Sequence, residues 1–461
     1  MNRRRLLQGA AGLAALLPVS GLMRRANADL PALPHPLLVH TMMLGGPDFR
    51  HMFPPAFDSP INSYGYRFYE GRARALGIAA NASAFADKWQ NGYAHFSAGQ
   101  TEFGMLAGCD WLGDMWRAGH VAIIANVVGA ESRDHEHAQR VWESADRTLS
   151  QVSAPPTGWG GRLADLADNQ VMSLTNTPRS FCFNRNPDAP LVPGSQRVVT
   201  LSDPRSIGLF EPADNADATA KGISRALRQY YAALDSTLPA AAPQRELLGH
   251  EQLLQTLGDK LRPQFDALTL PAEISALLGG PTALATRPLA AQVRNLYYAL
   301  SATADLDYHT ASLAFGNWDS HDIQQAEVEP KYRDLFSSTG ALANLYRTLP
   351  SSVSGQMVFM FSGEFGRQLR GNGDNGTDHG RGNSVLLVGY AVRGGVYGEL
   401  FPADELERFD EASTDINGRT HLESVLSPLL EYLKPGSADI VLPNRGTALT
   451  EAGVDLSRLI G

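Results

Sequence analysis

Residues 37–48 have the sequence LLVHTMMLGGPD, an apolar run that ends in two glycines, a proline and an acid. A continuous apolar run, without strict alternation of apolar and polar residues, is typical of a strand covered on both faces in a mostly parallel sheet. The strands predicted in this way span residues 37–44, 121–128, 307–315, 356–361 and 385–390. Helical patterns fill the intervals, for example at 85–96, 135–147, 221–234, 246–268 and 332–349. The chain is therefore predicted to be a layered α/β protein.

The region from about 150 to 300 has a different character. It holds Pro155-Pro156 and a proline-rich stretch from Thr177 to Pro204, followed by helical patterns without a strong strand between them. We interpret it as a helical insertion or cap on the sheet. The sequence contains no internal repeat, and we expect one α/β domain over residues 29–461.

The N-terminus predicts where the protein works. Residues 2–7, NRRRLL, match a twin-arginine signal, and an Ala/Leu/Gly segment follows as far as Met23. That segment is too short and too rich in glycine and proline to span a bilayer, and Ala26-Asn27-Ala28 forms a small-x-small cleavage site. We expect a signal peptide over residues 1–28, export by the twin-arginine translocase, and a periplasmic or extracellular location.

Charge narrows the range of partners. Residues 1–28 carry five arginines and no acid, so their removal changes the formal net charge from -9 to -14. Nucleic acid and anionic lipid both require a basic surface, and neither is expected as the main partner. A phosphate or sulfate ester would need local positive charge from a metal ion or an arginine. No other segment is long and apolar enough for a stable membrane span.

Cys109 and Cys182 are the two cysteines, and neither lies at zinc-finger spacing from another cysteine or a histidine. One disulfide or two buried thiols would both fit an oxidising compartment.

Ligands of an open parallel sheet bind beyond the carboxyl ends of its strands, so the residues just after the predicted strands indicate the chemistry. The segments there share an acid or an acid beside a histidine: 45–48 (GGPD), 132–135 (SRDH), 317–321 (NWDSH), 362–367 (SGEFGR) and 377–380 (TDHG). Carboxylate oxygen with imidazole nitrogen suits zinc, manganese or a similar divalent ion.

Some of these residues have simpler explanations. Asp48 could end a strand through an Asx turn, and Asp134 could be the N-cap of the following helix. The pairs Asp319/His321 and Asp378/His379 favour metal, because the chain places two of its 12 histidines beside acids after predicted strands. The run 371–376 fits G-x-G-x-x-G, but a strand follows it where a dinucleotide site requires a helix.

Six motifs, in their order and spacing, resemble the domain-of-unknown-function 1501 family. They are LGGPD (44–48), SRDH (132–135) with Gln139 and WES (142–144), GW (158–159), NWDSH (317–321), GEFGR (363–367) and GTDHGRGN (376–383). This is a bacterial export family, sulfatase-like and assigned to the alkaline phosphatase superfamily. The resemblance implies a three-layer α/β fold around a mostly parallel sheet.

The resemblance also implies a bimetallic hydrolase site, with zinc as the expected metal. Asp48, Asp378 and His379 would form one metal site, and Asp319 with His321 most of the other. Arg133, Asp134 and His135 are the expected catalytic residues, and Glu364 and Arg367 the expected supporting ones. Arg133 or Arg367 could hold a phosphate or sulfate oxygen bidentately. The substrate would be a small anionic ester or a modified glycan.

The sequence departs from the family pattern at Asp134, where the family usually has a serine nucleophile. A third ligand for the second metal is also missing from the obvious place, since Asn383 and Ser384 follow the Asp-His motif and His421 is the only later histidine. Two functions follow. One is an exported metal-dependent hydrolase of phosphate, sulfate or related esters that uses metal-activated water, with Asp134 as a metal ligand or general base. The alternative is a catalytically impaired member that acts in periplasmic binding or assembly.

Overall fold

The computed structural model describes residues 30–151, 157–175, 178–184, 197–201, 217–239, 243–279, 288–411 and 413–461. The expected signal peptide lies outside the described residues, as does most of the proline-rich stretch from Thr177 to Pro204.

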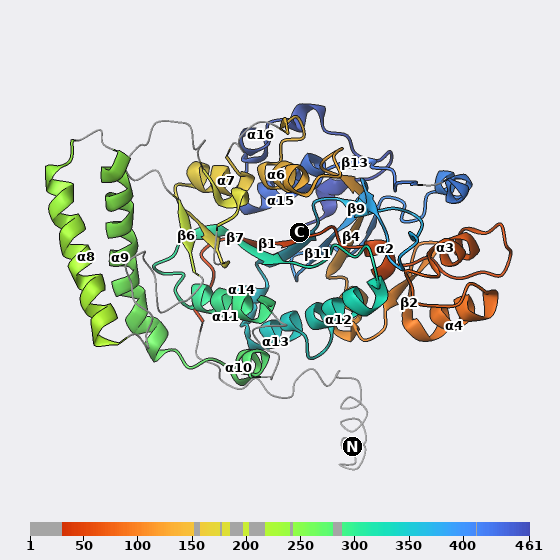
Figure 1. Cartoon of the computed structure of the whole chain (residues 1–461), viewed down its shortest axis with the longest axis horizontal. Coiled ribbons are helices and arrows are strands. Elements are labelled where there is room, and N and C mark those ends of the chain that lie inside the picture. The colour runs from red at the N-terminus through yellow and green to blue at the C-terminus, as the bar shows by residue number, and fades with distance from the viewer. Residues whose placement is uncertain are drawn as a thin grey trace, which may run out of the picture.

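A central sheet runs through the molecule (Figure 1). Its strand order is β12-β4-β11-β8-β1-β7-β5-β6, and β13 pairs with β4. The strands are β1 (Leu37–Met43), β4 (Val121–Val128), β5 (Gln170–Ser173), β6 (Val198–Thr200), β7 (Tyr308–Phe315), β8 (Met357–Ser362), β11 (Asn383–Val388), β12 (Gly395–Tyr397) and β13 (Thr420–His421). Every pairing is parallel except the two made by β11. The expectation of a mostly parallel central sheet is confirmed.

The sheet separates two hydrophobic cores, and successive residues of its strands enter them alternately. In β1, Leu37, Val39 and Met43 belong to one core, whereas Leu38 and Met42 belong to the other. The same alternation holds in β8, where Phe359 faces the first core and Met360 the second. Both faces of the sheet are therefore buried, as the continuous apolar runs predict.

Helices cover both faces (Figure 1). On the first-core side lie α2 (Phe49–Met52), α3 (Tyr64–Arg72), α4 (Ala82–Gly92), α5 (Asp110–Arg117), α10 (Ala272–Leu278), α11 (Pro288–Ser301), α12 (Gln324–Phe336), α13 (Ala341–Thr348) and α14 (Ser351–Ser354). On the other side lie α6 (His135–Ser144), α7 (Trp159–Ala167), α15 (Leu422–Leu433) and α16 (Ala438–Val441). The result is a mixed α/β architecture of three layers.

Two predicted helices differ from the structure. The predicted helix at 85–96 ends at Gly92, and residues 93–98 form strand β2 (Tyr93–Ala98), which pairs with β3 (Thr101–Leu106). The predicted helix at 332–349 is two helices, α12 and α13, separated by Ser337, Ser338, Thr339 and Gly340. Serine, threonine and glycine stabilise non-helical backbone, which explains the break.

The region 150–300 contributes to the sheet as well as to helices. Its short strands β5 and β6 extend the sheet beyond β7, where the sequence predicted no strong strand. Helices α8 (Ala218–Thr237) and α9 (Pro243–Ala267) form a hairpin beside the main body (Figure 1). The assignment of 150–300 as an insertion or cap stays a prediction.

Cys109 and Cys182 are buried and are not bonded to each other. Cys109 packs in the first core and Cys182 in the second, with the sheet between them. Of the two possibilities left open by the sequence, the structure therefore has two buried thiols.

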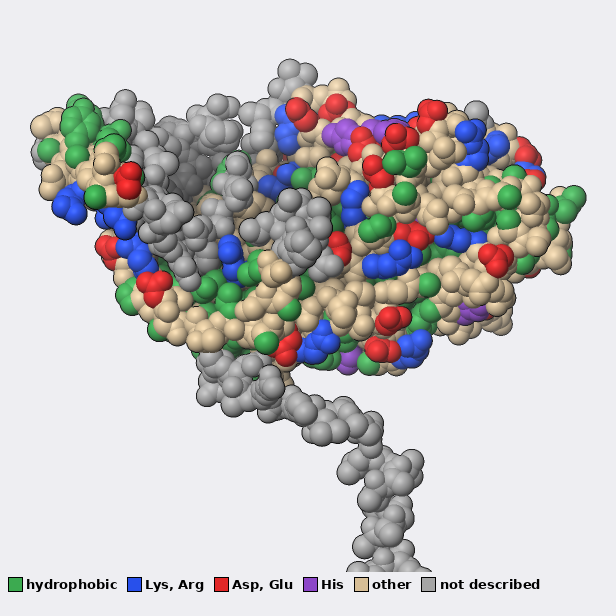
Figure 2. Space-filling view, turned by 60° about the horizontal axis from the view of Figure 1, so that its bottom comes forward, with side chains coloured by type: hydrophobic (Ala, Val, Ile, Leu, Met, Phe, Trp, Pro, Cys, Tyr) green, Lys and Arg blue, Asp and Glu red, His purple; other side chains and the backbone are tan. Residues whose placement is uncertain are grey.

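Acidic and basic side chains are interspersed over the face shown in Figure 2. Within the described part of the chain, no helix has both the length and the hydrophobicity needed to cross a membrane.

Candidate metal centre

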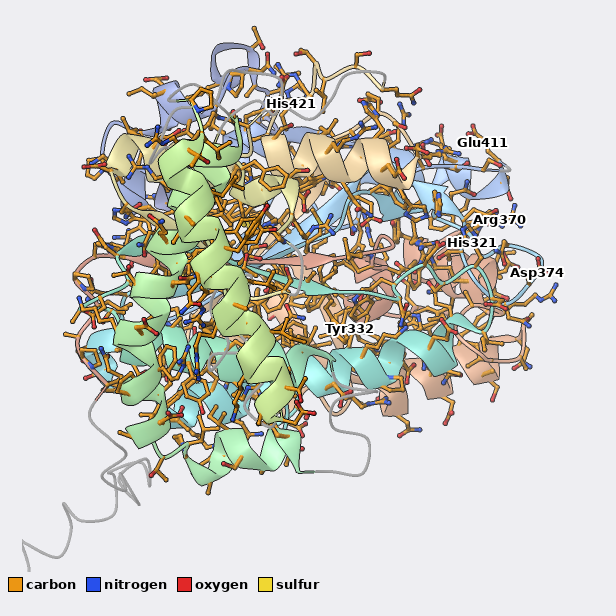
Figure 3. The ribbon with its side chains drawn as sticks, turned by 60° about the vertical axis from the view of Figure 1, so that its left-hand side comes forward. His321, Tyr332, Arg370, Asp374, Glu411 and His421 are labelled. Carbon is orange, nitrogen blue, oxygen red and sulfur yellow. The ribbon has the colours of Figure 1, made fainter. Side chains whose placement is uncertain are left out.

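The loops that carry the predicted site residues meet at one edge of the sheet. The loops after β1, β4, β7 and β8 lie there, because these strands run in the same direction. Strand β11 runs the opposite way, so the segment before it, with Asp378 and His379, arrives at the same edge. Figure 3 shows His321 there, with Arg370 and Asp374 nearby.

Glycines allow the loops to approach one another closely. Gly45, directly after β1, has a positive φ of 114°, and a Cβ on it would overlap the backbone nitrogen of Asp319. A Cβ on Gly376 would overlap the carbonyl of His321. Larger residues at these two positions would push apart the loops that hold Asp319 and His321.

Asp319 lies at the centre of a group of histidines. Among the described residues, His135, Asp319 and His379 offer ligand atoms that all lie within 4.8 Å of one another. His379 Nε2 is 2.9 Å from Asp319 Oδ1, and His135 Nε2 is 3.4 Å from Asp319 Oδ2. His321 joins the group, with its Nε2 3.1 Å from Asp319 Oδ1 and 2.9 Å from His379 Nε2. The four residues come from loops after β4 and β7 and from the segment before β11.

The other ring nitrogen of each histidine faces a hydrogen-bond acceptor. His135 Nδ1 lies 2.9 Å from Glu364 Oε1, and His321 Nδ1 lies 3.0 Å from Asp378 Oδ1. His379 Nδ1 lies 3.0 Å from the carbonyl oxygen of Arg133. These acceptors favour the tautomer with hydrogen on Nδ1, which leaves the lone pair on Nε2. All three Nε2 lone pairs then point toward Asp319.

Electrostatics keep two of these groups in forms that bind metal. Burial raises the pKa of Asp319, but the Arg367 guanidinium and the His379 ring beside the carboxylate outweigh it and lower this pKa to about 2. Burial lowers the pKa of His379, which favours its neutral form at neutral pH. The hydrogen bond to Glu364 raises the pKa of His135.

The buried side chains of Arg367 and Glu364 connect the loops of the group through hydrogen bonds. Arg367 is buried, and its guanidinium donates to the carbonyls of Gly45, Gly46, Trp318 and Thr377 and to Asp319 Oδ1. Glu364, also buried, accepts from Gly45 N at 2.7 Å and from Gln139 Nε2 at 3.2 Å in addition to His135. Both residues connect several loops of the group, and their supporting role in the site stays a prediction.

Asp48 is connected to the group's loops through Gln324. Its carboxylate is buried, forms an ion pair with Arg72, accepts from Gln324 Nε2 at 2.8 Å and caps helix α2 through His51 N at 3.1 Å. Gln324 in turn accepts hydrogen bonds from Ser320 and Thr377, which belong to the loops of the group. The structure thus links Asp48 to the group through Gln324, and its role as a metal ligand stays a prediction.

Asp134 is the N-cap of helix α6, where it accepts from His137 N at 2.8 Å. Ser132, two residues earlier, accepts from Asp134 N at 3.0 Å in a local turn. Arg133 contributes its carbonyl to His379, and its guanidinium forms an ion pair with Asp415. Of the three residues expected to be catalytic, His135 is the one whose side chain joins the histidine group.

Two participants were given no role in the site from the sequence, although Gln139 belongs to one of the quoted motifs. Asn372 donates to Asp378 Oδ1 at 3.0 Å and to the His321 carbonyl at 2.8 Å, and it lies in the glycine-rich run 371–376. Gln139, one helical turn after His135, carries the hydrogen bond to Glu364. Its i+4 spacing from His135 was the available signal.

Among the surface pockets lined by described residues, two bear on the location of the site. One of about 350 Å³ adjoins the loops of the group, between Arg74, Ile78, Ile323 and Asn375. A larger one of about 620 Å³ lies along α15 and the C-terminal segment. We place the functional site at the histidine group, where ligand-type atoms converge.

Residues 212–407 match the profile of a family described as protein of unknown function (DUF1501). The matched range includes Asp319, His321, Glu364, Arg367, Asp378 and His379. The resemblance expected from the motifs is thereby confirmed over this range, which is shorter than half of the chain. Comparison with curated proteins found no match.

Proposed function

We propose that this protein is a metal-dependent hydrolase of phosphate, sulfate or related esters, with an alkaline phosphatase-like arrangement of its sheet and loops. The observation that carries the proposal is the convergence of three imidazole Nε2 atoms on the Asp319 carboxylate. The resemblance to an exported family supports twin-arginine export and work in the periplasm or outside the cell.

The spacing of the group fits a metal ion. In tetrahedral zinc sites the metal–ligand bonds are about 2.0–2.2 Å, which separates neighbouring ligand atoms by roughly 3.3 Å. The separations between the Nε2 atoms and the Asp319 oxygens run from 2.9 to 3.4 Å. The set whose ligand atoms all lie within 4.8 Å of one another is His135, Asp319 and His379, two imidazoles and one carboxylate, which is a donor set that zinc accepts. His321, beside Asp319 and His379, is a further candidate ligand.

The contact between His321 Nε2 and His379 Nε2, at 2.9 Å, needs a positive charge. If both Nδ1 atoms carry hydrogen, two lone pairs face each other and repel. Either one ring becomes an imidazolium or a cation lies between the nitrogens. Burial disfavours the charged form of His379, which leaves two explanations, an imidazolium at His321 beside the Asp319 and Asp378 carboxylates or a bound cation, and metal analysis distinguishes them.

The partners of the Nδ1 atoms favour a bound metal ion. Ligating histidines usually donate their second nitrogen to a carboxylate or a backbone carbonyl, which fixes the ring and raises its basicity. Glu364, Asp378 and the Arg133 carbonyl occupy these positions. In this proposal Asp378 and Glu364 orient ligands, and His135, Asp319, His321 and His379 hold the metal, zinc being the first choice.

A divalent ion held there would polarise an ester oxygen and lower the pKa of a water molecule. The chain's own residues do the rest. Asp319 stays ionised over the physiological pH range, Arg367 neutralises part of its charge, and the buried Glu364 keeps the His135 ring oriented. The resemblance extends the proposal to a second metal ion near Asp48.

One observation favours the second candidate, a binding or assembly factor. The Asp134 carboxylate caps helix α6, and the Ser132 hydroxyl is engaged in the turn before it. Neither side chain is poised as a nucleophile. A protein that binds metal but turns over no ester would match this candidate.

Metal analysis tests the proposal. Wild type, His379→Ala and Asp319→Asn are purified with zinc present, dialysed and assayed for metal by mass spectrometry. His95→Ala is the matched control, since His95 stacks on Trp89 in the β2–β3 hairpin. We expect at least one ion per chain in wild type and control, and much less in the two variants.

Equal metal content in all four proteins would refute the metal centre. If the metal is present, phosphate and sulfate ester panels with and without chelator separate the two candidates. Asp134→Ser is the informative variant for catalysis, because serine can also cap the helix and so restores a hydroxyl without removing the cap.

A further inference from the structure

Two half-exposed arginines lie at the rim of the histidine group and share one buried carboxylate. Arg133 Nη2 is 2.7 Å from Asp415 Oδ2, and Arg381 Nε is 2.9 Å from the same oxygen. Asp415 is 4% exposed, whereas the Arg133 and Arg381 side chains are 41% and 44% exposed. The acid is therefore inside and the two guanidiniums face solvent.

Both arginines are tied to His379. The carbonyl of Arg133 accepts from His379 Nδ1 at 3.0 Å, and Arg381 follows His379 by two residues along the chain. A further ion pair, from Arg381 Nη1 to Glu131 at 2.8 Å, holds Arg381 against the loop after β4. The pair of guanidiniums thus borders the same loops that hold the candidate metal ligands.

We propose that Arg133 and Arg381, held side by side by Asp415, bind a tetrahedral oxyanion group of the substrate at the rim of the metal centre. The inference rests on the proposed function and assigns the recognition of the ester's phosphate or sulfate group to Arg133 and Arg381.

The geometry suits such a group. Arg133 and Arg381 bond the same oxygen, so their donor nitrogens are separated by no more than the sum of those two distances. A guanidinium has five N–H donors in a planar fork, and these two spend few of them on the contacts with Asp415 and Glu131. The remaining donors can bind two oxygens of one tetrahedral anion.

Arg367, the other arginine expected from the sequence to hold an ester oxygen, is placed differently. Its side chain is fully buried and donates to four backbone carbonyls and Asp319. Arg367 is therefore a positioning residue for Asp319, and the exposed Arg133 and Arg381 are the arginines available to bind the anion.

A simpler explanation is that the ion pairs only fasten the loops at 131–134 and 415 together. The two explanations differ in what an added anion does. A fastening pair changes stability when it is broken, whereas a recognition pair changes the affinity for the anion at unchanged metal content.

The test is calorimetric titration of the zinc-loaded protein with inorganic phosphate and, separately, with inorganic sulfate. The variants are Arg133→Ala, Arg381→Ala and Arg381→Lys. The matched control is Arg117→Ala, because Arg117 also pairs with an acid, Asp114, but lies at the end of α5, just before β4 enters the opposite edge of the sheet. Metal content and melting temperature are measured on the same samples.

We expect each alanine variant to weaken binding of one or both anions by about 10-fold or more. Arg381→Lys should bind with an affinity between those of Arg381→Ala and wild type. Metal content should not change, and the control should bind as wild type does. The anion that shows this dependence on arginine identifies the ester.

Unchanged affinity in metal-loaded Arg133→Ala and Arg381→Ala would overturn the inference, and so would the absence of any anion binding to wild type. A wild type without metal would instead overturn the proposed metal centre. The metal analysis of each sample tells these failures apart.

Discussion

Glu364 shows how one buried side chain determines the chemistry of a neighbouring one. It is fully buried, and its Oε1 holds His135 Nδ1 at 2.9 Å while accepting from Gly45 N. A neutral amide of the same shape keeps an acceptor there but loses the charge that makes His135 a stronger ligand. We expect Glu364→Gln to lower zinc affinity by roughly 10–100-fold with little change in fold.

Competition with a chromogenic chelator measures this affinity. Glu423→Gln is the control, since Glu423 is also buried but lies in the first turn of α15. Equal zinc affinity in Glu364→Gln and wild type would show that the charge of Glu364 does not strengthen His135 as a ligand.

His40 gives a pH dependence to stability. It lies in β1 beside the rings of Trp159 and Phe181, and burial lowers its pKa from 6.5 to about 3. Because the folded pKa is the lower one, the unfolded chain binds more protons between these values, and stability falls as the pH drops below about 6.5. At pH 5 the loss from this residue is about 2 kcal/mol.

Denaturant melts at pH 7.5 and pH 5 measure the effect in wild type and His40→Gln. The wild-type free energy of unfolding should fall by about 2 kcal/mol more than that of the variant between the two pH values. Identical losses would mean that His40 is protonated in the folded state at pH 5.

At the scale of elements, the glycine after β1 decides whether two loops can meet. Gly45 combines a φ of 114° with close approach to Asp319, whereas Gly99, in the β2–β3 turn, has a φ of 60° and open space around it. We expect Gly45→Ala to cost at least about 2 kcal/mol of stability, and Gly99→Ala about 1 kcal/mol. Denaturant melts give the free energies, and equal costs would contradict the packing argument.

The start of helix α12 is strained. Ile323, its N-cap, has a φ of 36°, a left-handed conformation that β-branched residues rarely adopt, and its side chain is exposed. Asparagine tolerates this conformation, so we expect Ile323→Asn to stabilise the protein by about 1 kcal/mol. Ile61→Asn, at another exposed isoleucine, should change stability by less than about 0.5 kcal/mol. A destabilised Ile323→Asn variant would show that the isoleucine packs usefully in the adjoining pocket.

These elements show what the sequence can predict. The five strands predicted from apolar runs all exist with boundaries within two residues, because burial on both faces demands uninterrupted apolar residues. Strands β5 and β6 are four and three residues long, too short for any periodicity to appear. The break between α12 and α13 depends on four small residues inside an otherwise helical pattern.

The sequence predicts which residues gather at the site but not the role of each residue. Asp319, His321, Asp378 and His379 do come together, but only the first pair follows a strand of the central sheet. Asp378 and His379 reach the same edge because they precede the antiparallel strand β11. Which nitrogen of each ring faces Asp319 depends on contacts between residues far apart in sequence, such as His135 with Glu364. Local spacing carries no information about these contacts.

At the scale of the whole molecule, the sheet is both a scaffold and a partition. One edge gathers the loops of the candidate metal centre, while the two faces support separate cores. Because the sheet separates the two cores, a side chain in one core cannot contact a side chain in the other. This separation predicts the oxidation state of the two thiols.

Cys109 and Cys182 lie in different cores, so they should stay reduced even in an oxidising compartment. Burial raises the pKa of both thiols, which also suppresses their reaction in the native state. We expect a thiol reagent at pH 8 to label neither cysteine in the folded protein and both in denaturant, and the melting temperature to be the same with and without reductant. An intact mass two hydrogens below the reduced value would reveal a disulfide, and the two cores could not then be separated by the sheet as described.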